Sequence, residues 1–561
     1  MPNNQNLSPQ WKQNLVLLAK NTHVWLAQLS RKYSTPILTI DLIPQEELDE
    51  IHSMGITGLW LVGLWERSPA SHRIKQLYGN DHLIGSAYSI NGYEVAADLG
   101  GEPALGILRD KAAKAGISLA CDMVPNHTGL DCPWVLDHPD WYIGSFHKPA
   151  STWEYNSENL SPREGVQIRI EDGYYTQQEA AEAFQYTTSS GFGPLYIYHG
   201  NDGTSMPWND TAQLNYLNSQ VREEVKKQIL DVARRFKIVR LDAAMTLLRS
   251  HYKRLWYPDP DGEKFIPTRN MNPMTQDEFD ALMPNEFWAE VLNDIRTHAP
   301  DTLLLAEAFW LMEKYFVREL GMHRVYNSAF LNHLRDENNA ELRRYLREII
   351  ENDPTLLESF INYLTTPDEA PAAESFGLAE KYFGACTLMA SLPGMPMFGH
   401  GQLDGFLEWY GMDFAKPMLG ESRDPEFFAE HQRSISPLLL QRRRFTSAQK
   451  MAIFDLQNEG QTNENVYIFS IISNNNKSLV IFNNSQRQAI GKLTRGWHHP
   501  DEREQSNEIT LINALRLQET ELIQFTEIRT GEKWISLKKD LTAKGLELTL
   551  LPYQSLVFSV D

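Results

Sequence analysis

Cysteine is scarce in this sequence, at 3 of 561 residues. Cys121, Cys132 and Cys386 cannot build a disulfide framework, and their odd number favours reduced thiols. Long hydrophobic runs are also missing: the apolar run at 15–18 is too short for a signal-peptide core, and no other run approaches the length of a membrane span. We therefore expect a cytoplasmic protein without a membrane partner.

Positive charge is in the minority. The chain has 52 Lys and Arg against 73 Asp and Glu, so its formal charge is −21. A field of this sign repels phosphate backbones and anionic lipids, which argues against nucleic acid as a partner. With 42% hydrophobic and 22% charged residues, the composition is that of a globular protein. It leaves homo-oligomerisation open.

The first 440 residues alternate short apolar runs with charged, helix-type segments, which predicts a parallel sheet with crossover helices. The clearest strand candidates are 58–64, 117–122, 237–242, 302–307, 360–364 and 395–398. Weaker candidates lie near 24–29 and 324–330. Together they make about eight strands, the number that closes a (β/α)8 TIM barrel.

Two stretches interrupt this alternation. Residues 128–215 are polar, aromatic and turn-rich, too long for an ordinary loop, and we expect an excursion domain that folds over the barrel mouth. From 441 to 561 the pattern changes to hairpins, which predicts a C-terminal β-sandwich domain. Residues 1–127 and 216–440 would then form the catalytic α/β barrel.

Polar side chains follow the predicted strands at the ends where a barrel carries its active site. A single carboxylate there is usually a solvated loop residue or a helix cap. An ordered set is different, because several carboxylates in one mouth repel one another and no structural need requires them. The set consists of Asp122, Asn126, His127, Arg240, Asp242, Glu307 and Asp368.

This set suggests glycoside chemistry. Arg240 lies two residues before Asp242 and on the same side of the strand, so we expect its charge to lower the Asp242 pKa and keep a nucleophile ionised. The apolar surroundings of Glu307 should raise its pKa and let it donate a proton. Two carboxyls on adjacent strands can lie roughly 5 Å apart, the separation of a retaining mechanism. Asp368 would bind sugar hydroxyls in the transition state.

The motifs resemble those of glycoside hydrolase family 13, the α-amylase family. Its signatures are matched by Asp-x-x-x-Asn-His at 122–127, by Arg-x-Asp at 240–242, by Glu307 after a hydrophobic strand, and by Asp368. The resemblance covers about 54–402, and the predicted β domain fits the family's usual C-terminal unit.

The resemblance implies a role for each matched residue. Asp242 would be the nucleophile, Glu307 the acid/base and Asp368 the transition-state stabiliser. The residues expected to bind the sugar are Asp122, His127, Arg240 and Tyr93, with Tyr93 stacking beneath the ring. Asn126 matches a position that often supports calcium in family amylases, but we favour a loop-closing hydrogen bond there and expect no required cofactor.

The fourth signature departs from the family pattern. Pro367 stands where a His usually precedes the Asp, and proline biases Thr366 towards an extended conformation. A similar Thr-Pro-Asp occurs in the family's maltosyltransferases that use maltose 1-phosphate. The stretches at 365–371 and 393–402 look most like the branch that contains hydrolases of 2-O-α-D-glucosylglycerol, a compatible solute.

Three hypotheses follow. The first is a retaining hydrolase of a small α-glucoside such as glucosylglycerol, and the second is a glucan-active amylase or a maltosyl or glucosyl transferase. The third, a non-catalytic sugar-binding protein, is disfavoured because all three carboxylates are kept. Residues that could close the pocket around an aglycone are Arg67, Trp153, Tyr155, Trp208 and Asn209. A phosphate-bearing donor would need nearby cations, and the candidates are Arg67, His72, Arg73 and Lys75.

Overall fold

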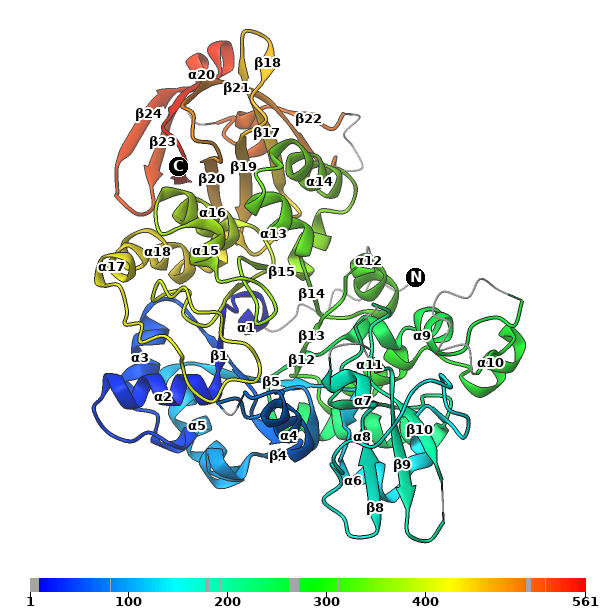
Figure 1. The fold of residues 1–561 in the computed structure, drawn as a ribbon. Coiled ribbons are helices and arrows are strands. Elements are labelled where there is room, and N and C mark those ends of the chain that lie inside the picture. Colours follow the sequence, from blue (N-terminus) through cyan, green and yellow to red (C-terminus); the bar gives the residue numbers. More distant parts are fainter. Residues whose placement is uncertain are drawn as a thin grey trace.

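The computed structural model describes residues 10–80, 82–176, 181–191, 193–204, 206–261, 272–309, 312–500, 506–519 and 521–561. Figure 1 shows a barrel part, a lobe beside it that carries β8 to β10, and a separate β part that ends the chain. The predicted fold class, a (β/α)8 barrel with an excursion after its third strand and a C-terminal β domain, is confirmed.

Eight parallel strands of the described residues close into a barrel in the order β1-β16-β15-β14-β13-β12-β5-β2. They are buried along almost their whole length, which explains why they read as continuous apolar runs. Their bounds are β1 (Leu17–Asn21), β2 (Gly58–Val62), β5 (Ser118–Met123), β12 (Ile238–Leu241), β13 (Leu303–Ala306), β14 (Arg324–Tyr326), β15 (Phe360–Tyr363) and β16 (Met395–Phe398).

The weak strand expected near 24–29 is wrong. The first barrel strand is β1, and the predicted segment lies in helix α2 (Thr22–Lys32). The Asn21 side chain accepts a hydrogen bond from the Val24 N–H and caps this helix. Trp25 and Leu29, four residues apart, are buried on one face of α2. The expected strand at 324–330 is also shorter, because α13 (Ser328–Arg335) begins directly after β14.

Helices pack around the barrel with one apolar face each. In α8 the buried residues Val221, Val225, Ile229 and Val232 recur at three- and four-residue steps, and Asn218 caps the helix. The longer helices of the described barrel part are α2, α3 (Gln45–Ser53), α4 (Pro69–Leu77), α5 (Gly101–Ala115), α8 (Ser219–Arg235), α9 (Arg249–Trp256), α11 (Phe287–His298), α13, α14 (Asn339–Asn352), α16 (Glu380–Ser391) and α17 (Pro425–Ser434).

The excursion after β5 starts and ends in one strand pair. β6 (His127–Gly129) and β11 (Thr211–Gln213) are antiparallel, so the two ends of the excursion are tied together beside the barrel mouth. Between them lies an antiparallel sheet in the order β7-β10-β9-β8. Its strands are β7 (Gly144–Ser145), β8 (Val166–Arg169), β9 (Ala183–Thr188) and β10 (Leu195–Tyr198).

The C-terminal part is a single hydrogen-bonded sheet of ten strands among the described residues. Alternate residues of β17 divide between two cores: Phe454 packs into a core inside this part, and Ile453 packs towards the barrel helices. The strands are β17 (Met451–Asn458), β18 (Gln461–Thr462), β19 (Val466–Ser473), β20 (Asn476–Asn483), β21 (Ala489–His498), β22 (Glu508–Ile509), β23 (Leu522–Glu527), β24 (Lys533–Leu537), β25 (Leu546–Leu550) and β26 (Ser555–Val560).

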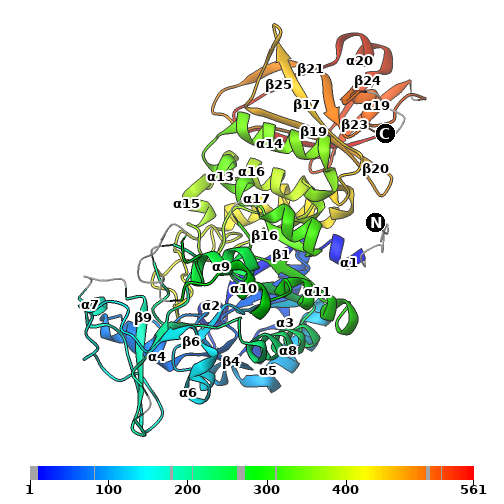
Figure 2. The ribbon, with the colours of Figure 1, turned by 90° about the vertical axis from the view of Figure 1, so that its right-hand side faces the viewer.

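Helices α14 and α16 lie between the barrel and this sheet (Figure 2). Arg343 of α14 is buried, pairs with Asp455 of β17, and lies 3.0 Å from Glu464. The Arg347 guanidinium stacks on Trp497 at 3.8 Å from the ring centre. The C-terminal sheet is therefore fixed to the barrel by buried charge pairs as well as by apolar packing.

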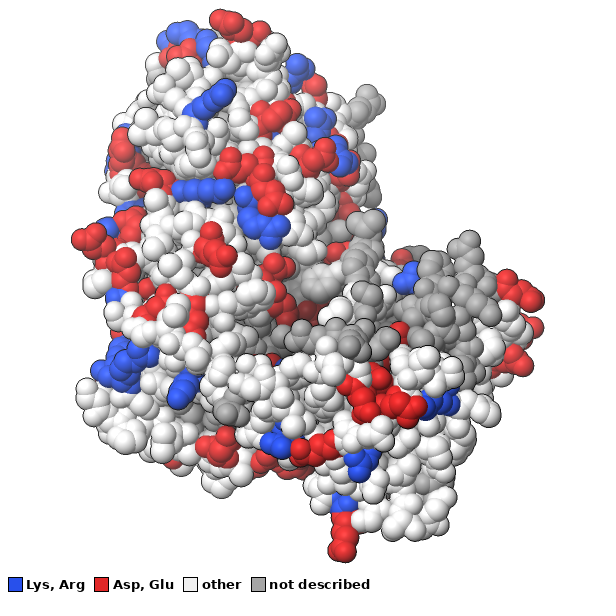
Figure 3. Space-filling model, in the orientation of Figure 1, with Lys and Arg blue, Asp and Glu red and all other residues white. Residues whose placement is uncertain are grey.

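In the described part of the chain, no helix is long and apolar enough to cross a membrane. The described Lys and Arg side chains form no continuous patch on the face shown in Figure 3, where acidic and basic residues are interspersed. This surface has none of the concentrated positive charge that a polyanion needs.

Candidate active site

Strand register brings the predicted polar residues together. β12 pairs with β5 so that Arg240 lies beside Asp122, and it pairs with β13 so that Leu241 lies beside Ala306. The next residue on each of these two strands is a carboxylate, Asp242 on one and Glu307 on the other. The register of β12 and β13 therefore places Asp242 and Glu307 next to each other.

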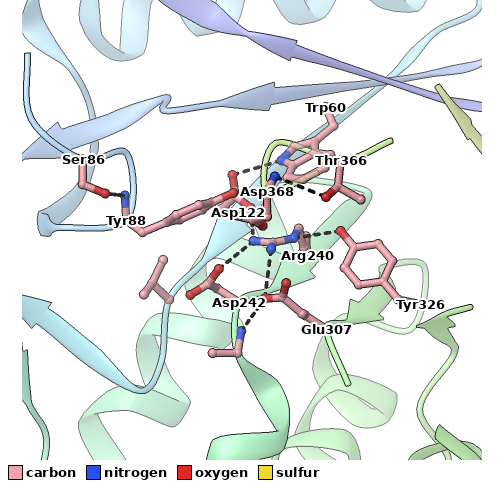
Figure 4. Close-up of polar contacts among 12 residues, drawn as sticks. Trp60, Ser86, Tyr88, Asp122, Arg240, Asp242, Glu307, Tyr326, Thr366 and Asp368 are labelled. Atoms are coloured by element: carbon pink, nitrogen blue, oxygen red, sulfur yellow. Dashed lines mark hydrogen bonds and ion pairs between the residues drawn. The ribbon is translucent and has the colours of Figure 1, made fainter. Parts of the chain in front are cut away.

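Arg240 is the centre of the site (Figure 4). One terminal nitrogen lies 2.8 Å from Asp242 and 3.0 Å from Asp122, and the other lies 2.9 Å from Glu307. The Nε–H donates to the Tyr326 hydroxyl at 2.9 Å. A single buried guanidinium thus holds three carboxylates, and its planar fork fixes their relative positions.

Aromatic rings surround this cation. The Arg240 guanidinium carbon lies 5.1 Å from the Trp60 ring centre and 5.2 Å from that of Tyr88. The Trp60 indole N–H also donates to Asp122 at 3.0 Å. The rings exclude water from the charged cluster and strengthen its electrostatic interactions.

The expected lowering of the Asp242 pKa is wrong. Burial raises the pKa of Asp242 to about 6, and the Arg240 charge offsets only part of this rise. The same balance raises the pKa of Asp122 to about 6. Because three carboxylates share one cation, the cluster is net negative when all three are ionised. Ionisation of each carboxyl group is therefore opposed by the charges of the others.

Glu307 has a hydrogen bond from the backbone as well as from Arg240. The Ala243 N–H, directly after the nucleophile candidate, donates to Glu307 at 2.8 Å. Ala243 adopts the left-handed conformation, with φ of 45°, which is rare for a residue with a side chain. Burial raises the pKa of Glu307, with a further contribution from Asp242. This is the direction that proton donation requires.

Asp368 stands on the loop after β15 and is exposed to the cavity. Its backbone N–H donates to the Thr366 hydroxyl at 3.2 Å, and the Trp409 indole N–H donates to the Pro367 carbonyl at 2.9 Å. The surrounding protein and the charge of Glu307 raise the pKa of Asp368 to about 6. A second loop, which carries Trp409, therefore holds the segment in which proline replaces the family histidine.

Asp242, Glu307 and Asp368 border a cavity of about 630 Å³, within the range of small-molecule sites. His127 and Trp208 meet at one wall with ring centres 4.9 Å apart, and burial lowers the pKa of His127 to about 4, so it is neutral at pH 7. Asn209 also borders the cavity. Other residues at its edge are Lys75, Tyr88, Asp202, Met206, Asp210, Phe309, Tyr326, Tyr363, Glu369, Met412 and Asp413.

Tyr93 is not part of this cavity. Its hydroxyl donates to the Val124 carbonyl at 3.0 Å and its ring packs edge-on against Trp65. Tyr88 borders the catalytic cavity, in the place where we expected Tyr93. The five-residue spacing of the two tyrosines spans the start of β4 (Ile90–Val95), and this strand carries Tyr93 away from the mouth.

Two of the expected lid residues also lie elsewhere. Trp153 and Tyr155 are buried, and the Tyr155 hydroxyl donates to the Ala183 carbonyl inside the excursion. They belong to the excursion's own core. Trp208 and Asn209, which follow the excursion's sheet, remain at the cavity.

Among the proposed phosphate-binding cations, the structure brings only Lys75 to the cavity edge, within the described residues. Arg67 is directed to the carbonyls of Gly85 and Met412, at 2.7 and 2.9 Å. Arg73 pairs with Glu158 on the outer side of α4 at 2.8 Å. His72 lies 3.2 Å from Gln76 on the same helix.

The Asn126 side chain is hydrogen-bonded to the excursion. Its amide forms a reciprocal pair with that of Gln213, at 3.1 and 3.0 Å. No group of three His, Cys, Asp or Glu side chains in the described part of the chain is arranged to hold a metal ion. The Asn126–Gln213 pair joins β11 of the excursion to the end of β5.

Sequence reasoning missed Tyr88 and Tyr326, and it missed the pairing of Lys75 with Asp413. Tyr326 ends the short strand β14, so a search for polar residues at every strand end would have found it. Asp413 had no such signal, because it lies in a long irregular segment between β16 and α17.

A comparison with protein families bears on this arrangement. The model of the alpha amylase catalytic domain matches residues 44–352, more than half of the chain. The chain belongs to the alpha-amylase family.

Individual relatives within this family are distant. Alpha-amylase 3 of Dictyoglomus thermophilum is 21% identical over 395 residues, which is 66% of this chain and 60% of that protein, so the chain spans about 60% of the relative's length. A maltogenic alpha-amylase from Thermotoga neapolitana has a TM-score of 0.60 at 14% identity, covering 98% of each chain. Trehalose-6-phosphate hydrolase of Bacillus licheniformis has 0.61 at 15% identity, covering 99% of this chain and 100% of that one. At such identities the likeness to these structures establishes the fold.

Proposed function

We propose that this member of the alpha-amylase family is a retaining α-glycoside hydrolase that acts by double displacement. The observation that carries the proposal is the shared guanidinium of Arg240, which holds Asp242 and Glu307 together at a cavity that Asp368 also borders. Two carboxyls with different partners, next to a third, are the groups that this chemistry needs.

In the first step the Asp242 carboxylate attacks the anomeric carbon, and Glu307 donates its proton to the glycosidic oxygen as that bond breaks. The leaving alcohol departs and a glucosyl ester of Asp242 remains. In the second step Glu307 takes a proton from water, the oxygen of that water attacks the same carbon, and the ester bond breaks. The product is α-glucose, and both residues return to their starting states.

The electrostatics of the site support these roles. With a pKa of about 6, Asp242 is largely ionised at pH 7, while burial and the neighbouring negative charge favour the protonated form of Glu307. Asp368 would bind ring hydroxyls more tightly as positive charge develops on the sugar. Neutral His127 would donate or accept a hydrogen bond, and Tyr88 would take the stacking role that we first gave to Tyr93.

For the substrate we propose 2-O-α-D-glucosylglycerol, a cytoplasmic solute that would be cleaved to glucose and glycerol. The segments at 365–371 and 393–402 support this choice through their likeness to the corresponding hydrolases. In this chain the first of these segments carries Asp368, and the second lies against it, since Thr365 and His400 line the same small cavity. The second candidate is a glucan-active amylase or transferase, favoured by the names of the relatives above and by a cavity larger than one sugar needs.

Anomer-resolved proton NMR tests the proposal. The purified protein is incubated with glucosylglycerol, maltose, maltoheptaose, sucrose and trehalose, with Asp242→Asn as the inactive control. Initial release of α-glucose from glucosylglycerol alone supports both the mechanism and the substrate. Cleavage or disproportionation of the maltooligosaccharides favours the second candidate. Initial β-glucose overturns the retaining roles of Asp242 and Glu307.

A further inference from the structure

The catalytic cavity has an uneven charge. Seven carboxylates border it among the described residues: Asp202, Asp210, Asp242, Glu307, Asp368, Glu369 and Asp413. Lys75 is the one Lys or Arg among these bordering residues. Whether the cavity accepts an anionic substrate therefore depends on whether this cation is available to a ligand.

Lys75 is already paired. Its ammonium lies 2.8 Å from Asp413, and the two side chains are 27% and 23% exposed, so they border the cavity without lying open to bulk water. Partial burial lowers the pKa of Lys75, but Asp413 and Asp210 raise it further, and the net shift is upward. Asp210 itself accepts a hydrogen bond from the Ser71 hydroxyl at 2.5 Å. Asp413 thus pairs directly with the ammonium group, and the charge of Asp210 acts on it from farther away.

Asp413 is held in this position by its own backbone. Its carbonyl accepts a hydrogen bond from the Ile84 N–H at 2.9 Å, and Leu83 and Phe414 form an isolated β-bridge. Arg67 binds the carbonyls on both sides of this contact. The segment that follows α4 and the segment that follows β16 are therefore joined, which fixes the Asp413 backbone beside Lys75.

We propose that Asp413 is a specificity-determining residue that restricts the cavity to uncharged α-glucosides by occupying Lys75. This inference rests on the proposed glycosidase function and names its substrate class. A phosphate monoester carries a charge of roughly −1.5 to −2 at pH 7. Placed among these carboxylates without a free cation, it is repelled, whereas a neutral polyol such as glycerol can bind their oxygens.

The test compares two substrates that differ by one group: 2-O-α-D-glucosylglycerol and the same glycoside with a phosphate monoester on its glycerol. We expect the wild-type kcat/KM to favour the neutral substrate. In Asp413→Asn this preference should fall by roughly tenfold, which corresponds to about 1.4 kcal/mol. This fall in preference should disappear in the double variant Lys75→Gln/Asp413→Asn, which has no ammonium group at this position. It should also become smaller at high salt, because salt screens the charge of the freed ammonium group.

Glu158→Gln is the matched control. It removes the carboxylate that pairs with Arg73 on the same helix, but this pair lies outside the cavity. The ratio of the two kcat/KM values should not change in this variant. A wild-type protein that prefers the phosphorylated glycoside overturns the proposal, as does a folded Asp413→Asn variant with an unchanged ratio. If Asp413→Asn does not fold, Asp413→Ser takes its place in the comparison.

A failure of the proposed function gives a different result. If neither glycoside is cleaved, the calorimetric Kd values of both for wild type and Asp413→Asn still measure the preference for the neutral ligand, without any turnover. A preference that falls in Asp413→Asn supports the role of Asp413 while the substrate assignment fails. An unchanged preference, or tighter binding of the phosphorylated glycoside by the wild type, rejects the role of Asp413, whatever the enzyme hydrolyses.

Discussion

Replacing the proposed nucleophile should make the protein more stable while it removes activity. Asp242 is buried in a cluster where three carboxylates share the single cation Arg240. Asp242→Asn keeps the size of the side chain and removes one negative charge. The remaining carboxylates, Asp122 and Glu307, are then no longer repelled by a third charge, and they share the guanidinium between two.

The expected gain in the free energy of unfolding follows from the pKa of Asp242. Asp242 takes up its proton near pH 6 in the folded protein, against an ordinary value of 3.8. The unfolded chain releases that proton more easily, so the folded state loses free energy relative to the unfolded state as the pH rises from about 4 to 6. A difference of about two pH units corresponds to about 3 kcal/mol, and this full cost is present at pH 7. Asp242→Asn removes it.

Urea unfolding of wild type and variant at pH 7 and at pH 4 measures this effect. We expect Asp242→Asn to be more stable by about 2–3 kcal/mol at pH 7, with the gain mostly lost at pH 4, and kcat to fall by roughly 10⁴-fold or more. Glu527→Gln is the control, because Glu527 is a buried carboxylate that binds Arg529 and three backbone N–H groups. The free energy of unfolding of the Glu527→Gln variant should be lower than that of the wild type by about 3 kcal/mol. An Asp242→Asn variant less stable than wild type at pH 7 would refute the reasoning.

Three further predictions concern the same site. The kcat/KM for a neutral glucoside should fall below about pH 6 as Asp242 and Asp368 become protonated, and a limb near pH 4 would contradict this assignment. Glu307→Gln should abolish hydrolysis of alkyl glucosides but still release 2,4-dinitrophenol from its α-glucoside, because this leaving group needs no proton. Added azide should then give an α-glucosyl azide, and a β-azide product is incompatible with retention. Trp409→Phe removes the indole N–H that binds the Pro367 carbonyl, so kcat should fall by roughly tenfold with little change in KM. An equal rise in KM would mean that Trp409 serves substrate binding instead.

Much of the barrel could be predicted because its strands are buried on both faces. Such strands appear as continuous apolar runs whatever their neighbours, and six of the eight were clear from the sequence. The first strand was misplaced because both β1 and α2 are apolar, and the Asn21 cap that separates them is a single polar residue. The strand order of the C-terminal sheet could not be predicted, because apolar patterns show which residues are covered but not which strands pair.

The acids of the site were also found from the sequence, since each one lies at the end of such a strand or in the loop that follows it. Their pKa values were not. Spacing places Arg240 and Asp242 on the same side of one strand, which suggests a simple ion pair. In the structure, burial and the neighbouring carboxylate of Asp122 raise the Asp242 pKa by more than Arg240 lowers it, which reverses the direction of the shift.

The sequence by itself determined the barrel, the order of the candidate catalytic acids and the family, because each depends on local patterns that repeat strand by strand. Only the tertiary structure decided which tyrosine borders the cavity and where Lys75 finds its partner. Tyr88 and Tyr93 look equivalent in the sequence, and 338 positions separate Lys75 from Asp413. Loops that are far apart in the chain meet only when the barrel closes and brings all its strand ends to one mouth.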